Sequence, residues 1–173
     1  MWNPNLHAAL WDVREALTTQ LDTEHLEWNY THLPYALTTV NFGKQTVCDT
    51  HMDDKDFAFM QSVLKCFGSF DYRKGGHLLF PSLKLAVQFP QGAEAYFPTA
   101  RLPHANTRIG PSEKRYSITS YSSGGHFEWA YRGGLHKYGW QEYLRTHELE
   151  EAEDARDAER PALLTERFFP IWH

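Results

Sequence analysis

The sequence lacks several features that would assign a class of protein at once. Its 173 residues include only two cysteines, Cys48 and Cys66, which are too few for a disulfide framework and are not spaced as a CxxC pair. No apolar run approaches the ~18 residues of a membrane span, and no basic stretch precedes an apolar one as in a secretory signal. We therefore expect an intracellular protein, nuclear or cytoplasmic, with no membrane partner.

Common catalytic signatures are also missing. The sequence has no GxxxxGK[ST] loop for a nucleotide phosphate, no HExxH zinc motif and no GxSxG nucleophile turn. One acidic cluster suggests a calcium loop and consists of Asp49, Asp53, Asp54 and Asp56. An EF-hand beginning at Asp49 would need Gly and Glu where Asp54 and Met60 stand, so this type of calcium site is excluded.

Charge is unevenly distributed along the chain. The net charge of −5 argues weakly against a general nucleic-acid binder. Residues 101–147 nevertheless carry more basic than acidic side chains, whereas residues 148–173 are strongly acidic. The basic segment could face an anionic ligand. The acidic segment could mask that ligand site, although we interpret it as the solvated face of a helix.

The ends of the chain predict helices. Asn3 before Pro4 is a typical helix start, and apolar residues then recur every three or four positions at Leu6, Leu10, Val13 and Leu17. After Gly139 the chain becomes rich in Glu, Ala, Leu and Arg, which predicts a helix that ends at Pro161. We expect residues 1–33 to form a helical cover and residues 126–173 to form an acidic helical extension packed on the core.

The middle of the chain, residues 34–125, has the texture of a β domain. Short runs rich in Val, Ile, Tyr, Phe and Thr alternate with Gly- and Pro-containing turns. The run over residues 57–67 is ambiguous, because a buried helix also fits its pattern. We predict a mainly β protein with flanking helices, whose core is a double-stranded β-helix, or jelly roll.

A pair of residues in this region could bind a metal. On a strand, His51 and Asp53 would point to the same face and offer a nitrogen and an oxygen ligand. In a jelly roll the chain would return to the same barrel mouth near His104. Two His and one carboxylate leave three open positions on Fe(II). Taken singly, the HxD motif also fits an exposed polar strand end, and His104 also fits a buried residue that bonds the backbone.

A basic residue follows His104 by one expected strand. Arg115 would point along the barrel, where its planar fork matches a carboxylate such as the distal one of 2-oxoglutarate. Ser117 lies two residues on, hence on the same face, and could donate a further hydrogen bond. An isolated arginine is more often a surface residue, so this prediction depends on the neighbouring metal ligands.

The sequence resembles the 2-oxoglutarate/Fe(II)-dependent dioxygenase superfamily over roughly residues 35–125. The resemblance lies in the order of its motifs, which are His51-x-Asp53, Gly75-Gly76-x-Leu78, Gly92 before an aromatic strand, His104 and Arg115-x-Ser117. It implies an enzyme that uses Fe(II), 2-oxoglutarate and O2 to hydroxylate a C–H bond. His51, Asp53 and His104 would then hold the iron, and Arg115 with Ser117 would hold 2-oxoglutarate.

Within the superfamily, the sequence is most similar to the TET/JBP branch of nucleobase oxygenases. The similar stretches are His51-x-Asp53-x-x-Asp56, GSFDYRKGGHLLFPSL and LPHAN. This implies a methyl group on a nucleic-acid base as the substrate, of the 5-methylcytosine, thymine or N-methyl type, and DNA or RNA as the partner. Because such a base must leave its stack, Asn41, Lys44 and Asp56 are candidate substrate contacts, or else ordinary loop residues.

Two alternatives remain open at this point. The same chemistry could act on a protein side chain or a small molecule, which the negative net charge favours somewhat. A catalytically inactive jelly roll could instead bind a partner through aromatic and acidic surfaces. The sequence does not indicate an oligomeric state.

Overall fold

The computed structural model describes residues 3–20 and 27–168. Its contacts divide the chain into two units. The helical unit comprises the described parts of Met1–Pro34 and Gly125–His173, and the β unit comprises Tyr35–Gly124. Within the described ranges, no helix combines the length and the apolar character needed to cross a membrane.

Helix α1 (Pro4–Gln20) begins as its sequence predicts. The Asn3 side chain caps the helix, because its Oδ1 accepts a hydrogen bond of 3.0 Å from the Leu6 N–H. The apolar stripe is buried as expected, at positions Leu6, Leu10, Val13 and Leu17. Capping and the 3.6-residue period therefore account for this helix.

Between Gly124 and Phe168, the described C-terminal part forms three helices, α2 (Gly124–Tyr131), α3 (Lys137–Thr146) and α4 (Glu150–Phe168). The predicted stop at Pro161 is wrong, because α4 continues through it to Phe168. Proline removes one backbone hydrogen bond, and Asp157, whose carbonyl loses its partner, is exposed to water. The chain turns instead at Glu148, which has a left-handed φ of 55°. That these helices cover the β unit stays a prediction.

The β unit contains two antiparallel sheets. The larger has the order β1–β7–β2–β5, and its strands are β1 (Leu37–Asn41), β7 (Lys114–Tyr121), β2 (Ser62–Ser69) and β5 (Glu94–Phe97). The smaller has the order β4–β3–β6, and its strands are β4 (Leu85–Val87), β3 (Leu78–Phe80) and β6 (Ala105–Asn106).

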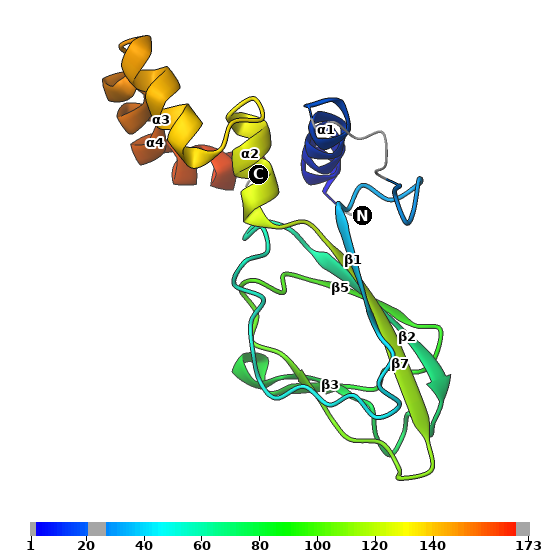
Figure 1. Cartoon of the computed structure of the whole chain (residues 1–173). Helices are drawn as coiled ribbons and strands as arrows, with labels where there is room; N and C mark the ends of the chain where they lie inside the picture. The colour runs from blue at the N-terminus through cyan, green and yellow to red at the C-terminus, as the bar shows by residue number, and fades with distance from the viewer. Residues whose placement is uncertain (1–2, 21–26, 169–173) are drawn as a thin grey trace. The chain divides into compact units, whose positions relative to one another are not determined.

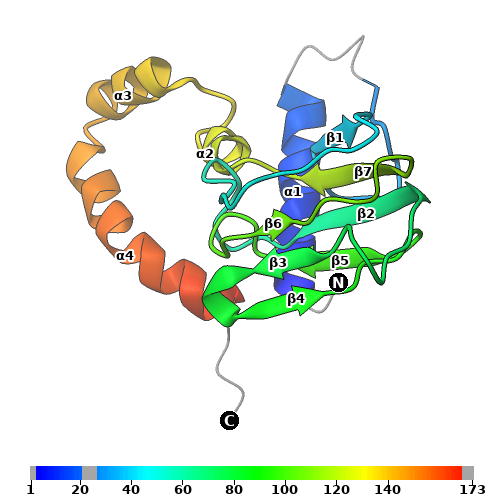
Figure 2. The ribbon, with the colours of Figure 1, turned by 90° about the horizontal axis from the view of Figure 1, so that it is seen from below.

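The chain passes repeatedly from one sheet to the other. After β1 it reaches the smaller sheet at His51, which pairs with His104 next to β6, and it then returns to the larger sheet in β2. Strands β3 and β4 belong to the smaller sheet, β5 to the larger, β6 to the smaller and β7 to the larger. Figure 1 shows the two layers, and Figure 2 shows β4, β3 and β6 side by side. This connectivity is that of a double-stranded β-helix, as predicted.

A mainly aromatic cluster packs between the sheets beside the pocket described below. It contains the buried residues Cys66, Phe70, Leu78, Phe80, Phe89 and Phe97. Phe80 of β3 and Phe97 of β5 meet edge to face, with ring centroids 5.1 Å apart, so the two sheets are joined by this contact. Each such buried side chain contributes about 1.5–3 kcal/mol to folding.

The structure specifies two stretches of the β unit more closely than the sequence does. The ambiguous run over residues 57–67 becomes strand only from Ser62 onward. The apolar stretch over residues 77–89 forms two strands, because a short 3-10 helix, Pro81–Leu83, separates β3 from β4. The prediction of a mainly β core with flanking helices fits the structure, although helical residues outnumber extended ones among the described residues.

Candidate metal centre

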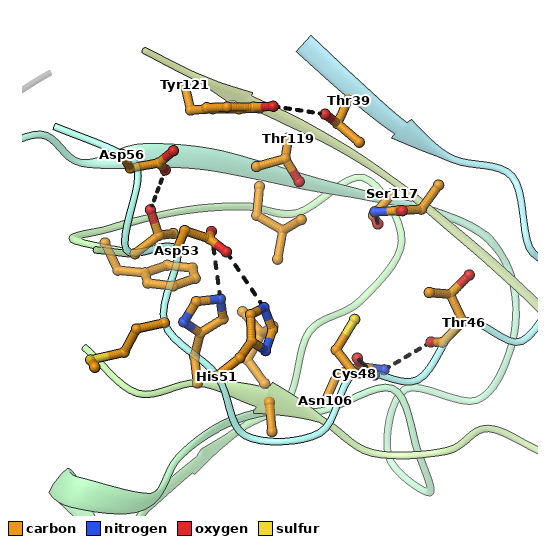
Figure 3. A pocket seen from close by; sticks show the side chains of 18 of the residues that line it. Thr39, Thr46, Cys48, His51, Asp53, Asp56, Asn106, Ser117, Thr119 and Tyr121 are labelled. Atoms are coloured by element: carbon orange, nitrogen blue, oxygen red, sulfur yellow. Dashed lines mark hydrogen bonds and ion pairs between the residues drawn. The ribbon is translucent and has the colours of Figure 1, made fainter. Parts of the chain in front are cut away.

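A pocket of about 560 Å³ lies inside the β unit. Both sheets and the segment that connects β1 to β2 contribute to its lining (Figure 3). The lining includes His51, Asp53, His104 and Arg115, so the structure brings together residues that are far apart in the sequence. This volume is within the usual range for small-molecule sites.

Backbone pairing places the two histidines opposite each other. The N–H of each donates to the carbonyl of the other, and both bonds measure 3.0 Å. As a result, the rings of His51 and His104 lie with their centroids 4.3 Å apart. Asp53 is two residues beyond His51, and its N–H donates to the carbonyl of Thr99 at 3.0 Å. Each candidate ligand therefore has a backbone anchor on a different part of the chain.

Hydrogen bonds also orient the histidine rings. His51 Nδ1 lies 2.7 Å from the carbonyl of Asp49, and His104 Nδ1 lies 2.9 Å from the carbonyl of Leu102. A carbonyl only accepts, so each Nδ1 is the donor, and Nε2 is the ring atom that remains to bind a metal. These Nε2 atoms lie 3.6 and 4.0 Å from the carboxylate oxygens of Asp53.

The three side chains form a donor set that fits a divalent metal. One ligand atom from each of His51, Asp53 and His104 lies within 4.8 Å of the other two. Two neutral imidazoles and one carboxylate carry a single negative charge, which suits Fe(II) and leaves part of its coordination sphere open. His104 is 8% exposed and its ring packs against that of Phe97, whereas His51 is exposed. Solvent therefore reaches the site on the His51 side.

Arg115 is a buried cation without a counter-ion. It is only 4% exposed, and within the described residues no carboxylate lies within ion-pair distance of it. Its Nε atom is buried without a hydrogen-bond partner. The Cys66 thiol contacts the Arg115 side chain, but burial outweighs that contact and raises the pKa of the thiol. An uncompensated guanidinium in a pocket is costly, so an anionic ligand would relieve it.

Ser117 lies beside Arg115, as predicted from their spacing. It is buried, lines the same pocket and accepts a hydrogen bond of 3.1 Å at its Oγ from the Asn41 amide. Asn41 lies directly opposite Ser117 in the β1–β7 register and also lines the pocket. Two predicted contact residues thus share one wall with the arginine.

The other two candidate substrate contacts differ from each other. Asp56 lines the pocket, but its Oδ2 already accepts hydrogen bonds from Ser62 at 3.0 Å and Thr99 at 2.8 Å. Burial raises the pKa of this carboxyl group. Lys44 is exposed and is not part of the pocket lining, while its carbonyl accepts from the Arg115 N–H at 2.8 Å. The structure therefore does not bring the Lys44 side chain to the site.

Sequence reasoning missed several residues of the pocket wall. Thr39 and Tyr121 line the pocket, and their hydroxyl groups lie 3.1 Å apart. They occupy alternate positions on the same strands as Asn41 and Ser117, so the period of two residues could have identified them. Cys48 and Asn106 were also missed. Asn106 ends the LPHAN stretch two residues after His104, whereas no local pattern marks Cys48.

Comparisons with known proteins give only distant similarities. No protein-family model and no curated protein matches the chain. Similar solved structures include NgTET1 in complex with 5mC DNA, at 19% identity and a TM-score of 0.49. This match covers 73% of this chain and 50% of that one.

Two structures of the collagen prolyl hydroxylase from Paramecium Bursaria Chlorella virus-1 are also similar. The 2OG complex has 17% identity and a TM-score of 0.36, covering 50% of this chain and 60% of that one. The truncated protein has 18% identity and a TM-score of 0.36, and this match covers 48% of this chain and 52% of that one. The matches span half to three-fifths of these proteins, so an activity has to be argued from the site itself.

Proposed function

We propose that the chain is a dioxygenase that uses Fe(II), 2-oxoglutarate and O2 to hydroxylate a C–H bond. One observation carries this proposal. A single pocket contains both a His51–Asp53–His104 donor set and the buried guanidinium of Arg115, which makes no ion pair with the described residues and whose Nε has no hydrogen-bond partner. A metal site alone would fit many hydrolytic or structural roles. A neighbouring buried cation adds a place for the free carboxylate of an acid that binds the metal at its other end.

In this proposal His51 and His104 bind the iron through Nε2, and Asp53 binds it through a carboxylate oxygen. The bound Fe(II) would supply the chemistry that activates O2 and binds the 2-oxo acid. The carbonyls of Asp49 and Leu102 keep each imidazole in the required tautomer and orientation. The aromatic ring of Phe97 shields the His104 side from water.

Arg115 and Ser117 bind the distal carboxylate of 2-oxoglutarate in this proposal. The guanidinium is always charged and presents a planar pair of donors. Because Arg115 is almost fully buried, little water competes for the bound anion. The Ser117 hydroxyl can donate to the same carboxylate, while its oxygen accepts from Asn41.

For the substrate we propose a methyl group on a base of DNA or RNA. The support is the resemblance around His51-x-Asp53-x-x-Asp56 and the pocket volume, which suits a base that has left its stack. Asn41 and the unused carboxylate oxygen of Asp56 would contact the edge of the base. Lys44, which is exposed outside the pocket, would contact a phosphate.

The charge of the chain favours a second candidate substrate. A net charge of −5 and the acidic surface of α4 disfavour a polyanion, so a protein side chain or small molecule is the alternative. A binding module without catalysis is the further alternative. It would retain the pocket but would bind neither metal nor 2-oxoglutarate.

An anaerobic titration tests the proposed chemistry. Adding Fe(II) and then 2-oxoglutarate should produce the visible charge-transfer band of a 2-oxo acid chelate, and Asp53→Ala should abolish it. A wild-type protein that gives no band and binds neither compound would contradict the dioxygenase proposal and support the binding module.

A second experiment tests the substrate. Succinate release is measured with methylated and with otherwise identical unmodified oligonucleotides, alongside a panel of peptides and small molecules. Stimulation by the methylated strands alone is expected. Stimulation by a peptide or a metabolite instead would replace the nucleic-acid substrate and leave the dioxygenase class intact.

A further inference from the structure

The segment of residues 44–51 connects the two functional parts of the pocket. At its start, the carbonyl of Lys44 accepts the Arg115 N–H, and at its end His51 pairs with His104. Between these points the segment contains no regular strand, yet Thr46 and Cys48 line the pocket. The separation between Arg115 and the metal ligands therefore depends on what holds this irregular stretch.

A single side chain, Asn106, holds the middle of the segment. Its Oδ1 accepts from the Cys48 N–H at 2.8 Å, and its Nδ2 donates to the carbonyl of Thr46 at 3.0 Å. The Asn106 backbone N–H also donates to the carbonyl of Cys48 at 3.2 Å. Figure 3 shows the amide beside Thr46 and Cys48. Nδ2 has a second, longer contact of 3.3 Å with the carbonyl of Thr107.

Asparagine suits this place because its side-chain amide has the donor and acceptor of a peptide group. It therefore pairs with the segment as one residue of a neighbouring strand would. Asn106 is 9% exposed, so water competes little for these bonds. It belongs to β6, where it also pairs with Leu78 of β3, and it follows the ligand His104 by two residues. The smaller sheet thus positions His104 directly. Through the Asn106 amide it also positions the segment that leads to His51.

We propose that Asn106 is a positioning residue that clamps residues 46–48 and so sets the distance between Arg115 and the metal ligands. The proposal rests on the proposed function, because that distance matters only if one acid spans both groups. Asn106 does not touch the reacting atoms. It acts by fixing the backbone of residues 46–48. The distance from the guanidinium to the metal then matches a 2-oxo acid of one chain length.

The chain contains its own reporter for this clamp. Cys48 lies in the clamped segment and is partly exposed, whereas Cys66 is fully buried in the core. In metal-free protein, Asn106→Ala should raise the rate of Cys48 alkylation by iodoacetamide about tenfold, as expected when buried hydrogen bonds are lost. Alkylation of Cys66 should stay at its wild-type rate. A general loss of stability would instead accelerate both thiols.

Two variants control for the kind of change. Asn5→Ala removes an asparagine amide that donates to the carbonyl of Arg167 at 2.9 Å in the helical unit, and it should leave Cys48 at its wild-type rate. Asn106→Asp keeps an acceptor for the Cys48 N–H but loses the donor to Thr46. Its alkylation rate should lie between those of wild type and Asn106→Ala. Equal rates in wild type and a folded Asn106→Ala would overturn the clamp.

Metal and acid binding test the consequence of the clamp. Co(II) affinity, followed by the visible spectrum, should fall about tenfold in Asn106→Ala. This is the low end of the loss of metal affinity usual when a residue that orients metal ligands is removed. The preference for 2-oxoglutarate over 2-oxoadipate, which is one methylene longer, should also fall. Unchanged Co(II) affinity together with an unchanged preference would contradict the positioning role.

Hydrogen exchange tests the clamp even if no Asn106 variant folds. In the wild-type protein, the Cys48 amide should exchange at least about tenfold more slowly than those of Val47 and Asp49. Within the described residues, neither Val47 N–H nor Asp49 N–H has an acceptor. Equal exchange at all three amides would overturn the proposal. Alkylation and exchange need no metal or acid, so a failure of the proposed function alone would leave both results unchanged.

Discussion

The strand that holds Arg115 and the segment that holds two of the candidate metal ligands build the same pocket by different means. Strand β7 is paired along both edges, with β1 on one side and β2 on the other. The segment of residues 44–56 forms only isolated bridges, at Gln45, His51 and Asp56. Its remaining anchors include hydrogen bonds to the side chains of Asn106, Ser62 and Thr99.

Because of this difference, the positions of the two sets of side chains depend on the sequence in different ways. In β7 the backbone ladder places Arg115 and Ser117, so many neighbouring side chains can change without moving them. In the ligand segment, individual side chains replace the missing ladder, so single substitutions should move the metal ligands. The proposed anion site should therefore be sensitive to changes of backbone conformation, and the proposed metal site to changes of side chains.

The largest effect should come from a metal ligand. Asp53→Ala removes the only carboxylate of the donor set and should lower metal affinity by more than about 100-fold, beyond the usual effect of residues outside the ligand set. Co(II) titration measures this. Asp49→Ala is the matched control, because only its carbonyl contacts His51, and it should retain wild-type affinity. Equal losses in both variants would argue against Asp53 as a ligand.

The next effect should appear at the anion site alone. Arg115→Ala should raise the KM for 2-oxoglutarate by about 30-fold or more, equivalent to losing a buried charge pair worth ~2 kcal/mol or more. Arg115→Lys keeps the charge but loses the planar fork, so it should recover part of the binding. Metal affinity should remain near wild type in both variants. A parallel loss of metal affinity would show that the two sites are not separable.

A glycine in the ladder tests the backbone side of the comparison. Gly68 pairs with Arg115, has φ of +127°, and a Cβ there would lie 2.1 Å from the Lys114 carbonyl oxygen. Gly68→Ala should destabilise the protein by about 1–3 kcal/mol. Gly92→Ala is the control, because φ is +84° but no atom lies within 4 Å of the added Cβ, so it should cost less. Urea unfolding measures both, and equal costs would contradict the close approach at Gly68.

The smallest effect concerns Asp56 and pH. Burial raises the pKa of this carboxyl group in the folded protein, so the folded state binds the proton more tightly than the unfolded chain. Its contribution to stability therefore decreases as pH rises from its ordinary pKa through the folded value. Asp56→Asn can still accept from Ser62 and Thr99 and should lose this decrease. The measurement is the free energy of unfolding of both proteins across that pH range. Identical pH profiles for the wild type and Asp56→Asn would contradict the prediction.

Local patterns predicted the parts of the site that depend on a strand period. Arg115 and Ser117 share a face of β7 because they are two residues apart. His51 and Asp53 also meet at one site, although the chain there forms only an isolated bridge and not a regular strand. Lys44 follows Asn41 closely in sequence but lies outside the pocket, since the chain leaves β1 at that asparagine. Sequence proximity to a strand end does not determine where a side chain points.

The role of Asn106 could not be predicted in this way. Its partners are the backbone atoms of Thr46 and Cys48, which carry no residue-specific signal and lie in a distant part of the sequence. The helix through Pro161 shows a similar limit, because the proline rule gives the cost of the lost hydrogen bond but does not show that Asp157, whose carbonyl loses its partner, is exposed to water. Segment types follow from local propensity, whereas the contacts that replace a regular ladder require the fold.

The two ends of the β unit lie next to each other. Leu37 and Tyr121 are paired across β1 and β7, and the Ala36 N–H donates to the Ser122 Oγ at 3.0 Å. The chain therefore enters and leaves this unit at one edge, as it does in domains inserted into a host sequence. One uninterrupted stretch, Tyr35–Gly124, includes every residue of the pocket and could be transplanted or circularly permuted as a cassette without cutting through the site.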